Sequence, residues 1–164
     1  MASLDPKIIM GNDNGGFRWS MGRIMTNALL LVVMLACMRV EGNPTGKPTD
    51  SGYTQGQLCI SRDAVVDVNK AYGTRYTFRD MRNRQKAMDV FVKYANRWHA
   101  QTPEEIARIH NGGPDGMHKR QTKAYWRKVA AELMSPRLRT QFMTALAIES
   151  MKQSGRGRGG RVVL

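Results

Sequence analysis

Apolar residues recur at helical spacing along the second half of the chain, and this pattern limits the fold more than any other feature. From Arg84 to Trp98 they fall three and four residues apart, on one face of a helix. These residues are Ala87, Val90, Phe91, Tyr94, Ala95 and Trp98. A second run uses Thr122, Tyr125, Trp126, Val129, Ala130 and Leu133, and a third, opened by Ser135-Pro136, carries Leu138, Phe142, Leu146 and Met151. The sequence therefore predicts a mainly α fold.

The length and charge of the chain limit its architecture and its partners. A chain of 164 residues fits one domain with tails and has enough mass for a hydrophobic core. It carries 26 Lys and Arg against 13 Asp and Glu, a formal net charge of +13. This charge favours an anionic partner such as nucleic acid, a membrane surface or an acidic cell-wall polymer, and it does not choose among them.

The cysteines and histidines predict no metal site and no cofactor. Cys37 and Cys59 are too few for a disulfide framework and lack the spacing of metal ligands, so the redox compartment stays open. His99 and His118 are single imidazoles without a partner at ligand spacing. Cys59 has apolar flanks and no sequence neighbour that would lower the pKa of its thiol, which predicts a packing role.

An unbroken apolar run occupies residues 28–38. It follows a basic patch with Arg18 and Arg23, as the hydrophobic part of a secretory signal does. The run is short for a membrane span and equally fits a buried helix. Two interpretations remain open: a signal or membrane anchor, and a helix of the core.

The chain divides into four segments on this basis. Residues 1–27 are expected to form a flexible basic N-terminal segment, and residues 28–38 the apolar signal, anchor or core helix. Residues 39–152 are the folded domain, with helical support from residue 28 onward if the chain is not cleaved. Residues 153–164 are a basic Gly/Arg-rich tail that cannot pack into a core. Glu149-Ser150 is interpreted as the end of the last helix.

A capped helix leads into a glycine-rich turn at residues 102–116. Thr102, Pro103 and Glu105 are an N-cap, a first-turn proline and a capping-box acid, so a helix is expected to begin there. It is expected to end at Asn111-Gly112-Gly113-Pro114, where glycine tolerates left-handed geometry and proline prevents continuation. His110 and Asn111 would lie at the helix mouth, where an amide can bond sugar hydroxyl or N-acetyl groups and the glycines admit a polysaccharide. An ordinary helix C-cap explains the same residues.

The stretch between Asn43 and Leu58 is irregular and poor in apolar residues. Proline and glycine punctuate it, so this loop is either held by other parts of the molecule or disordered. Ser61 then has the character of a helix N-cap, and the valines that follow it fit either a helix or a short strand. Gly73 breaks that element.

Glu41 is the best candidate for acid catalysis, because it ends the apolar segment. A carboxyl group that is partly removed from water has a raised pKa, and the general acid of a glycosidase must hold a proton near neutral pH. Asp50, in the loop that follows, would stabilise a positive sugar centre or activate water. The alternative is that Glu41 only begins a solvated loop, since most glutamates lie on the surface.

Three segments, in their order and spacing, resemble the lysozyme-like superfamily of bacterial lytic transglycosylases, phage muramidases and invertebrate-type lysozymes. The first, VEGNP at 40–44, is similar to the end of the helix that delivers the catalytic Glu in that group. The second, GQLCI at 56–60, is similar to a Gly-x-x-Gln-Ile segment. The third, RIHNGGP at 108–114 with Tyr125-Trp126 after it, is similar to an Arg-x-His-Asn-Gly-Gly-Pro loop followed by a Tyr-Trp helix. The resemblance covers roughly Leu31 to Leu133.

The resemblance implies both a fold and a site. The fold would be a single lysozyme-like helical domain, in which a long loop with a short β element forms one side of a glycan groove. Glu41 takes the role of general acid, with Asp50 as its catalytic partner. The implied substrate-binding residues are Cys59, Ser61, His110, Asn111, Gly112, Gly113 and Tyr125.

The implied function is that of a peptidoglycan glycosidase, a lytic transglycosylase or muramidase that cleaves the MurNAc–GlcNAc linkage. It would act on glycan strands outside the cytoplasm, as a periplasmic, secreted or membrane-anchored protein, or as part of a virion. The apolar segment at 28–38 would serve a membrane or virion association.

Two other functions compete with this one. Gly42 replaces the Ser that usually follows the family's glutamate, and Cys59 replaces its Gln. These departures favour a catalytically weak or inactive wall-binding protein of the same fold, for example a phage virion component. A nucleic-acid binder that uses the charge and the Arg-rich tail ranks last, because no basic helix with interleaved aromatic residues is present.

Overall fold

The computed structural model describes residues 27–156, and within them the prediction of a mainly helical single domain is confirmed. The α-helices are α1 (Asn27–Glu41), α2 (Arg62–Tyr72), α3 (Arg84–Arg97), α4 (Pro103–Gly112), α5 (Arg120–Leu133) and α6 (Arg139–Arg156). Shorter 3-10 helices are η1 (Asp50–Gly52), η2 (Phe78–Arg82) and η3 (Gly116–His118). The strands β1 (Thr54–Gln55) and β2 (Ile60–Ser61) pair antiparallel, with Thr54 opposite Ser61.

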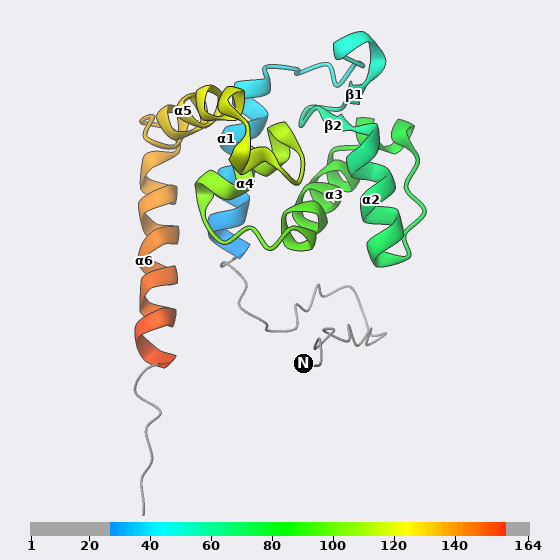
Figure 1. Cartoon of the computed structure of the whole chain (residues 1–164). Coiled ribbons are helices and arrows are strands. Elements are labelled where there is room, and N and C mark those ends of the chain that lie inside the picture. The colour runs from blue at the N-terminus through cyan, green and yellow to red at the C-terminus, as the bar shows by residue number, and fades with distance from the viewer. Residues whose placement is uncertain (1–26, 157–164) are drawn as a thin grey trace, which may run out of the picture.

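Helix α1 forms the centre of the hydrophobic core. It packs against α4, α5 and α6, and Figure 1 shows α6 along one side of the body and α2 and α3 on the other. Its buried residues are Leu29, Leu30, Val32, Val33, Met34, Ala36 and Cys37. Burying one such aliphatic side chain stabilises a fold by about 1.5–3 kcal/mol. The apolar run at 28–38 is therefore a helix of the core in this structure, which is one of its two interpretations.

The two ends of the chain leave part of the segment division outside the described residues. Residues 1–26 and 157–164 are not described, so the flexible N-terminal segment and most of the basic tail stay predictions. Helix α6 runs into the predicted tail as far as Arg156, and Glu149-Ser150 lies inside it. The interpretation of Glu149-Ser150 as a helix end was therefore wrong, because no proline or glycine follows until Gly155. Within residues 27–156, no helix has the length and hydropathy that crossing a membrane requires.

The irregular loop after α1 is held in place by its own hydrogen bonds. Gly56 N donates to Gly46 O at 3.1 Å, and Asn43 Nδ2 donates to Gly56 O at 3.1 Å. The two-stranded sheet β1–β2 is the predicted short β element. Ser61 then caps α2, because its Oγ accepts from Ala64 N at 3.1 Å, and the valines after it are helical.

The predicted helix boundaries are confirmed for α3 and α4. Asn83 caps α3, and its Oδ1 accepts from Lys86 N at 3.0 Å. The capping box of α4 is complete, since Thr102 Oγ1 accepts from Glu105 N and Glu105 Oε2 accepts from Thr102 N. Gly113 ends α4 with φ +78° and ψ −166°, a conformation that is essentially open to glycine alone. These caps fix where the residues at the end of α4 lie.

Candidate active site

Glu41 lies at the C-terminal end of α1, where side chains from α4 and α5 meet it. Its side chain is 18% exposed. Tyr125, on α5, donates its hydroxyl to Glu41 Oε1 at 2.8 Å. His110 Nε2, in the last turn of α4, lies 3.6 Å from the same oxygen. Three helices that are distant in the sequence therefore place one carboxylate, one phenol and one imidazole together.

The helices hold these partners through buried neighbours. Thr122, Val129 and Leu133 are the buried residues of α5. Their burial determines which face of α5 turns toward the core, and Tyr125 lies on that face. The His110 side chain is only 7% exposed, and its ring centroid lies 4.9 Å from that of Phe91 on α3. His110 is thus packed inward against Glu41, whereas the next residue, Asn111, is exposed.

Cys59 is a polar partner of Glu41, not a packing residue. Its sulfur accepts from Asn43 Nδ2 and from Thr49 Oγ1, each at 3.8 Å, and its thiol interacts with the Glu41 carboxylate. Its backbone is left-handed, with φ +47°. The packing role predicted from its apolar flanks left out these donors, because they come from the folded loop and not from sequence neighbours. Burial and the charge of Glu41 raise the pKa of Cys59, so the thiol stays protonated.

The pKa of Glu41 is lower than its ordinary value of 4.5. Burial is the largest single influence and raises it, but the hydrogen bond and charge of His110, with the hydrogen bonds of Tyr125 and Cys59, together outweigh burial. The expected raised pKa was therefore wrong, because it rested on burial and left out the three donors. Glu41 is ionised at neutral pH in the free protein.

Tyr125 keeps its proton beside this carboxylate. Burial raises its pKa most, and the neighbouring Cys37 and Glu41 raise it further. Burial also raises the pKa of Cys37 to about 12. Both groups are therefore neutral, and the phenol is a fixed hydrogen-bond donor to Glu41.

Two of the remaining predicted site residues bond neighbours other than Glu41. Asp50 is exposed and accepts a hydrogen bond from Thr54 Oγ1 at 3.2 Å. Among the residues that the structure describes, no carboxylate hydrogen-bonds or ion-pairs with Glu41, so Asp50 does not contact it directly and its catalytic role stays a prediction. Ser61 is occupied as the cap of α2. Gly112 and Gly113 are partly exposed at the end of α4, beside Asn111.

Three polar residues of the cluster were not singled out from the sequence. Cys37 lies one helical turn before Glu41 on α1, and this spacing places both on one face. Asn43 and Thr49 hold the sulfur of Cys59. No local sequence pattern points to them, since their role depends on how the loop folds back.

A surface hollow of the described residues does not coincide with the predicted site. A hollow of about 470 Å³ is lined by Arg39, Glu132, Ser135, Pro136 and Arg137, and it contains none of the predicted site residues. Within residues 27–156, no group of three or more His, Cys, Asp or Glu side chains could hold a metal ion.

Comparisons with known proteins do not assign this cluster to a family. The chain matches no protein-family model, and a search of curated proteins finds no match.

Proposed function

We propose that the protein is a peptidoglycan glycosidase that cleaves the MurNAc–GlcNAc linkage, with Glu41 as its acid and base. The observation that carries this proposal is the Glu41 carboxylate, mostly buried and in contact with Tyr125 and His110. The exposed amide of Asn111 follows His110, where it can bond sugar groups. The net charge of +13 favours the anionic cell wall, which lies outside the cytoplasm.

The single carboxylate in the cluster favours the transglycosylase route. Glu41, once protonated, gives its proton to the glycosidic oxygen as the bond to the sugar breaks. The carboxylate then takes a proton from a hydroxyl of the substrate, whose oxygen attacks the same sugar carbon and closes an anhydro ring. Hydrolysis in the inverting manner would use a second carboxylate about 6.5–9.5 Å from the acid to hold a water, a separation at which the two groups do not touch. The products of cleavage, and not the missing contact between Asp50 and Glu41, therefore separate the two routes.

Because the pKa of Glu41 is lowered, cleavage is expected to speed up as the pH falls below neutral. A general acid acts in its protonated form, and the protonated fraction falls about tenfold per pH unit above the pKa. Replacing His110 by Leu removes a hydrogen bond and a charge that lower the pKa, while the burial that raises it remains. The His110→Leu variant is therefore expected to have a higher Glu41 pKa and to stay active at higher pH than the wild type.

Two measurements check this shift: the pH–rate profile of dye release from labelled cell walls, and the carbon-13 NMR titration of the Glu41 carboxyl group. His99→Asn is the control, because His99 is exposed beyond the end of α3, outside the Glu41 cluster and the segment that follows α4, and asparagine tolerates its backbone at φ +53°. Its profile is expected to equal that of the wild type. A Glu41 pKa that is unchanged or lower in His110→Leu would contradict the assigned electrostatics.

The lowered pKa of Glu41 also favours a second candidate, a protein that binds the wall without cutting it. An ionised Glu41 is a poor proton donor, and a sugar could still bond Asn111. Retention of the full chain on insoluble peptidoglycan, measured together with release of soluble fragments, separates the two functions. Release supports the glycosidase, whereas retention without release at every pH between 4 and 8 supports the binding protein.

A further inference from the structure

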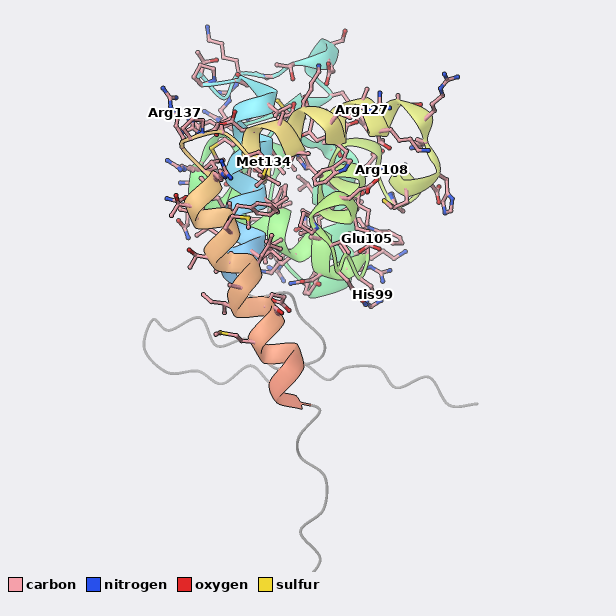
Figure 2. All side chains as sticks on the ribbon, turned by 90° about the vertical axis from the view of Figure 1, so that its left-hand side faces the viewer. His99, Glu105, Arg108, Arg127, Met134 and Arg137 are labelled. Carbon is pink, nitrogen blue, oxygen red and sulfur yellow. The ribbon has the colours of Figure 1, made fainter. Side chains whose placement is uncertain are left out.

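Arg108 is a buried cation that the proposed chemistry does not use. It lies on α4, two residues before His110, and its side chain is 4% exposed. Figure 2 labels it above Glu105 of the same helix in that view. Removing a guanidinium from water is costly unless its donors are bonded. One partner is Glu104, which accepts from Nη1 at 2.7 Å and is partly exposed.

The other partners of Arg108 belong to the segment between α4 and α5. Its Nε donates to Thr122 Oγ1 at 3.0 Å. Its Nη2 donates to Met117 O at 2.6 Å and also lies 3.5 Å from Gly116 O and Lys119 O. The fork of the guanidinium therefore reaches backbone carbonyls of η3 and of Lys119, which follows it, and the first turn of α5 at once.

Thr122 completes this arrangement from the other side. Its Oγ1 lies 2.6 Å from Gly116 O and 2.8 Å from Lys119 O. The backbone of Gly116 also lies directly on α4, because a Cβ there would be 2.1 Å from Arg108 O. The segment 113–119, which we name the turn segment, is thus fixed to α4 by side-chain bonds and by close packing.

The turn segment connects the two parts of the candidate site. It begins at Gly113, two residues after Asn111, and it ends where α5 begins. Tyr125, which donates to Glu41, follows Thr122 by about one helical turn. A shift of the turn segment would therefore move the residues that we expect to bind the glycan.

We propose that Arg108 is a positioning residue, which holds the turn segment in the shape that binds the glycan. The role rests on the proposed function, since it assumes that the end of α4 and the turn segment contact the substrate. Arg108 itself touches no substrate in this account. Its bonds hold the backbone of the turn segment before binding, so less ordering is needed when a glycan strand enters.

The test compares Arg108→Lys with Glu104→Gln in the full chain. Lysine keeps the positive charge, but all its donor hydrogens are on one nitrogen. It therefore cannot bond Thr122, Met117 and Glu104 at the same time. We expect KM for soluble peptidoglycan fragments to rise about tenfold or more in Arg108→Lys, with kcat per folded molecule nearly unchanged. Glu104→Gln removes only the partly exposed partner and is expected to leave KM within about twofold.

A role in global stability alone would give a different result. It would lower the active fraction, and with it the apparent kcat, while KM stayed the same, and that outcome would overturn the proposal. If Arg108→Lys does not fold, Thr122→Val replaces it, because this change removes the hydroxyl that bonds Arg108 and Gly116 O. Thr122→Val is expected to raise KM in the same way, and Thr122→Ser to match the wild type.

Hydrogen exchange tests the same role without a substrate. The amides of His118 and Lys119 donate within the turn segment, at 2.9 Å and 3.2 Å. We expect them to exchange at least about tenfold faster in Arg108→Lys, while amides of α2 and α3 keep their rates. Unchanged exchange of the turn segment would overturn the proposal. If no variant cleaves peptidoglycan, the proposed function fails, and the exchange rates alone then decide whether Arg108 holds the turn segment.

Discussion

Glu41→Gln is expected to lower the rate of peptidoglycan cleavage by about 10³-fold, since one positioned general acid contributes about 10²–10⁴-fold. Glutamine has nearly the same shape, so the hydroxyl of Tyr125 can still donate to its oxygen. The amide neither gives nor takes a proton in the reaction. The measurement is the initial rate of dye release from labelled cell walls at equal concentrations of folded protein, with urea unfolding as the check on the fold.

Glu132→Gln is the matched control for this change. Glu132 lies on α5 and pairs with Arg39, with Nε and Oε1 3.5 Å apart and the Glu132 side chain 26% exposed. The variant removes the same charge from the same helical body and leaves the Glu41 cluster intact. It is expected to keep at least half of the wild-type rate, because exposed ion pairs contribute little. Equal losses in the two variants would mean that Glu41 acts through general charge and not as the acid.

Gly56→Ala is expected to destabilise the fold by more than about 4 kcal/mol, the range in which a single substitution is exceptional. Gly56 has φ +86°, and a Cβ there would lie 2.0 Å from Met81 O. Met81 is fully buried on η2, so this backbone oxygen cannot move away without disturbing the core. Because the loop that carries Cys59 starts at Gly56, the variant is also expected to lose the cluster around Glu41. Urea unfolding of the full chain gives the free-energy change.

Gly52→Ala separates backbone strain from the steric clash. Gly52 has φ +85°, nearly the same as Gly56, but a Cβ there would meet nothing within 4 Å. Its alanine variant is expected to lose about 1–2 kcal/mol, the cost of the left-handed conformation alone. If Gly56→Ala and Gly52→Ala are destabilised equally, the close contact between Gly56 and Met81 is not present in solution.

The helices could be predicted from the sequence because their signals are local. Apolar spacing alone gave α3 within one residue of its observed end, and the capping box at Thr102 and Glu105 gave the start of α4. The end of α4 followed from glycines that admit a positive φ. Each of these features depends on residues within one or two helical turns, which the sequence displays directly.

The surroundings of Glu41 could not be predicted in the same way. Tyr125 is 84 positions away in the sequence, and nothing local indicates that α5 brings its hydroxyl to the end of α1. Burial raises the pKa of Glu41, and its hydrogen-bond donors lower it by more. A prediction from burial alone therefore had the pKa shift in the wrong direction. Asp50, the first carboxylate after Glu41 in the sequence, lies on η1 and accepts a hydrogen bond from Thr54 Oγ1.

The apolar run of α1 shows a related limit. A short, uniformly apolar segment fits a signal, an anchor or a core helix, because its composition does not show whether lipid or other parts of the protein pack against it. The neighbours α4, α5 and α6 cover it here, and Leu31 alone among its leucines and valines is clearly exposed, at 43%. These packing partners come more than 60 residues later in the chain, so the sequence around the run does not display them.

The most direct test of the account is mass spectrometry of purified peptidoglycan after digestion with the full chain at pH 5. Soluble fragments that end in anhydro-MurNAc are expected, and Glu41→Gln is expected to release them about 10³-fold more slowly. Fragments with ordinary reducing ends would keep Glu41 as the acid but replace the substrate's hydroxyl by water. Fragments cut only at peptide bonds, or equal release by the wild type and Glu41→Gln, would contradict the central claim that Glu41 cleaves the glycan.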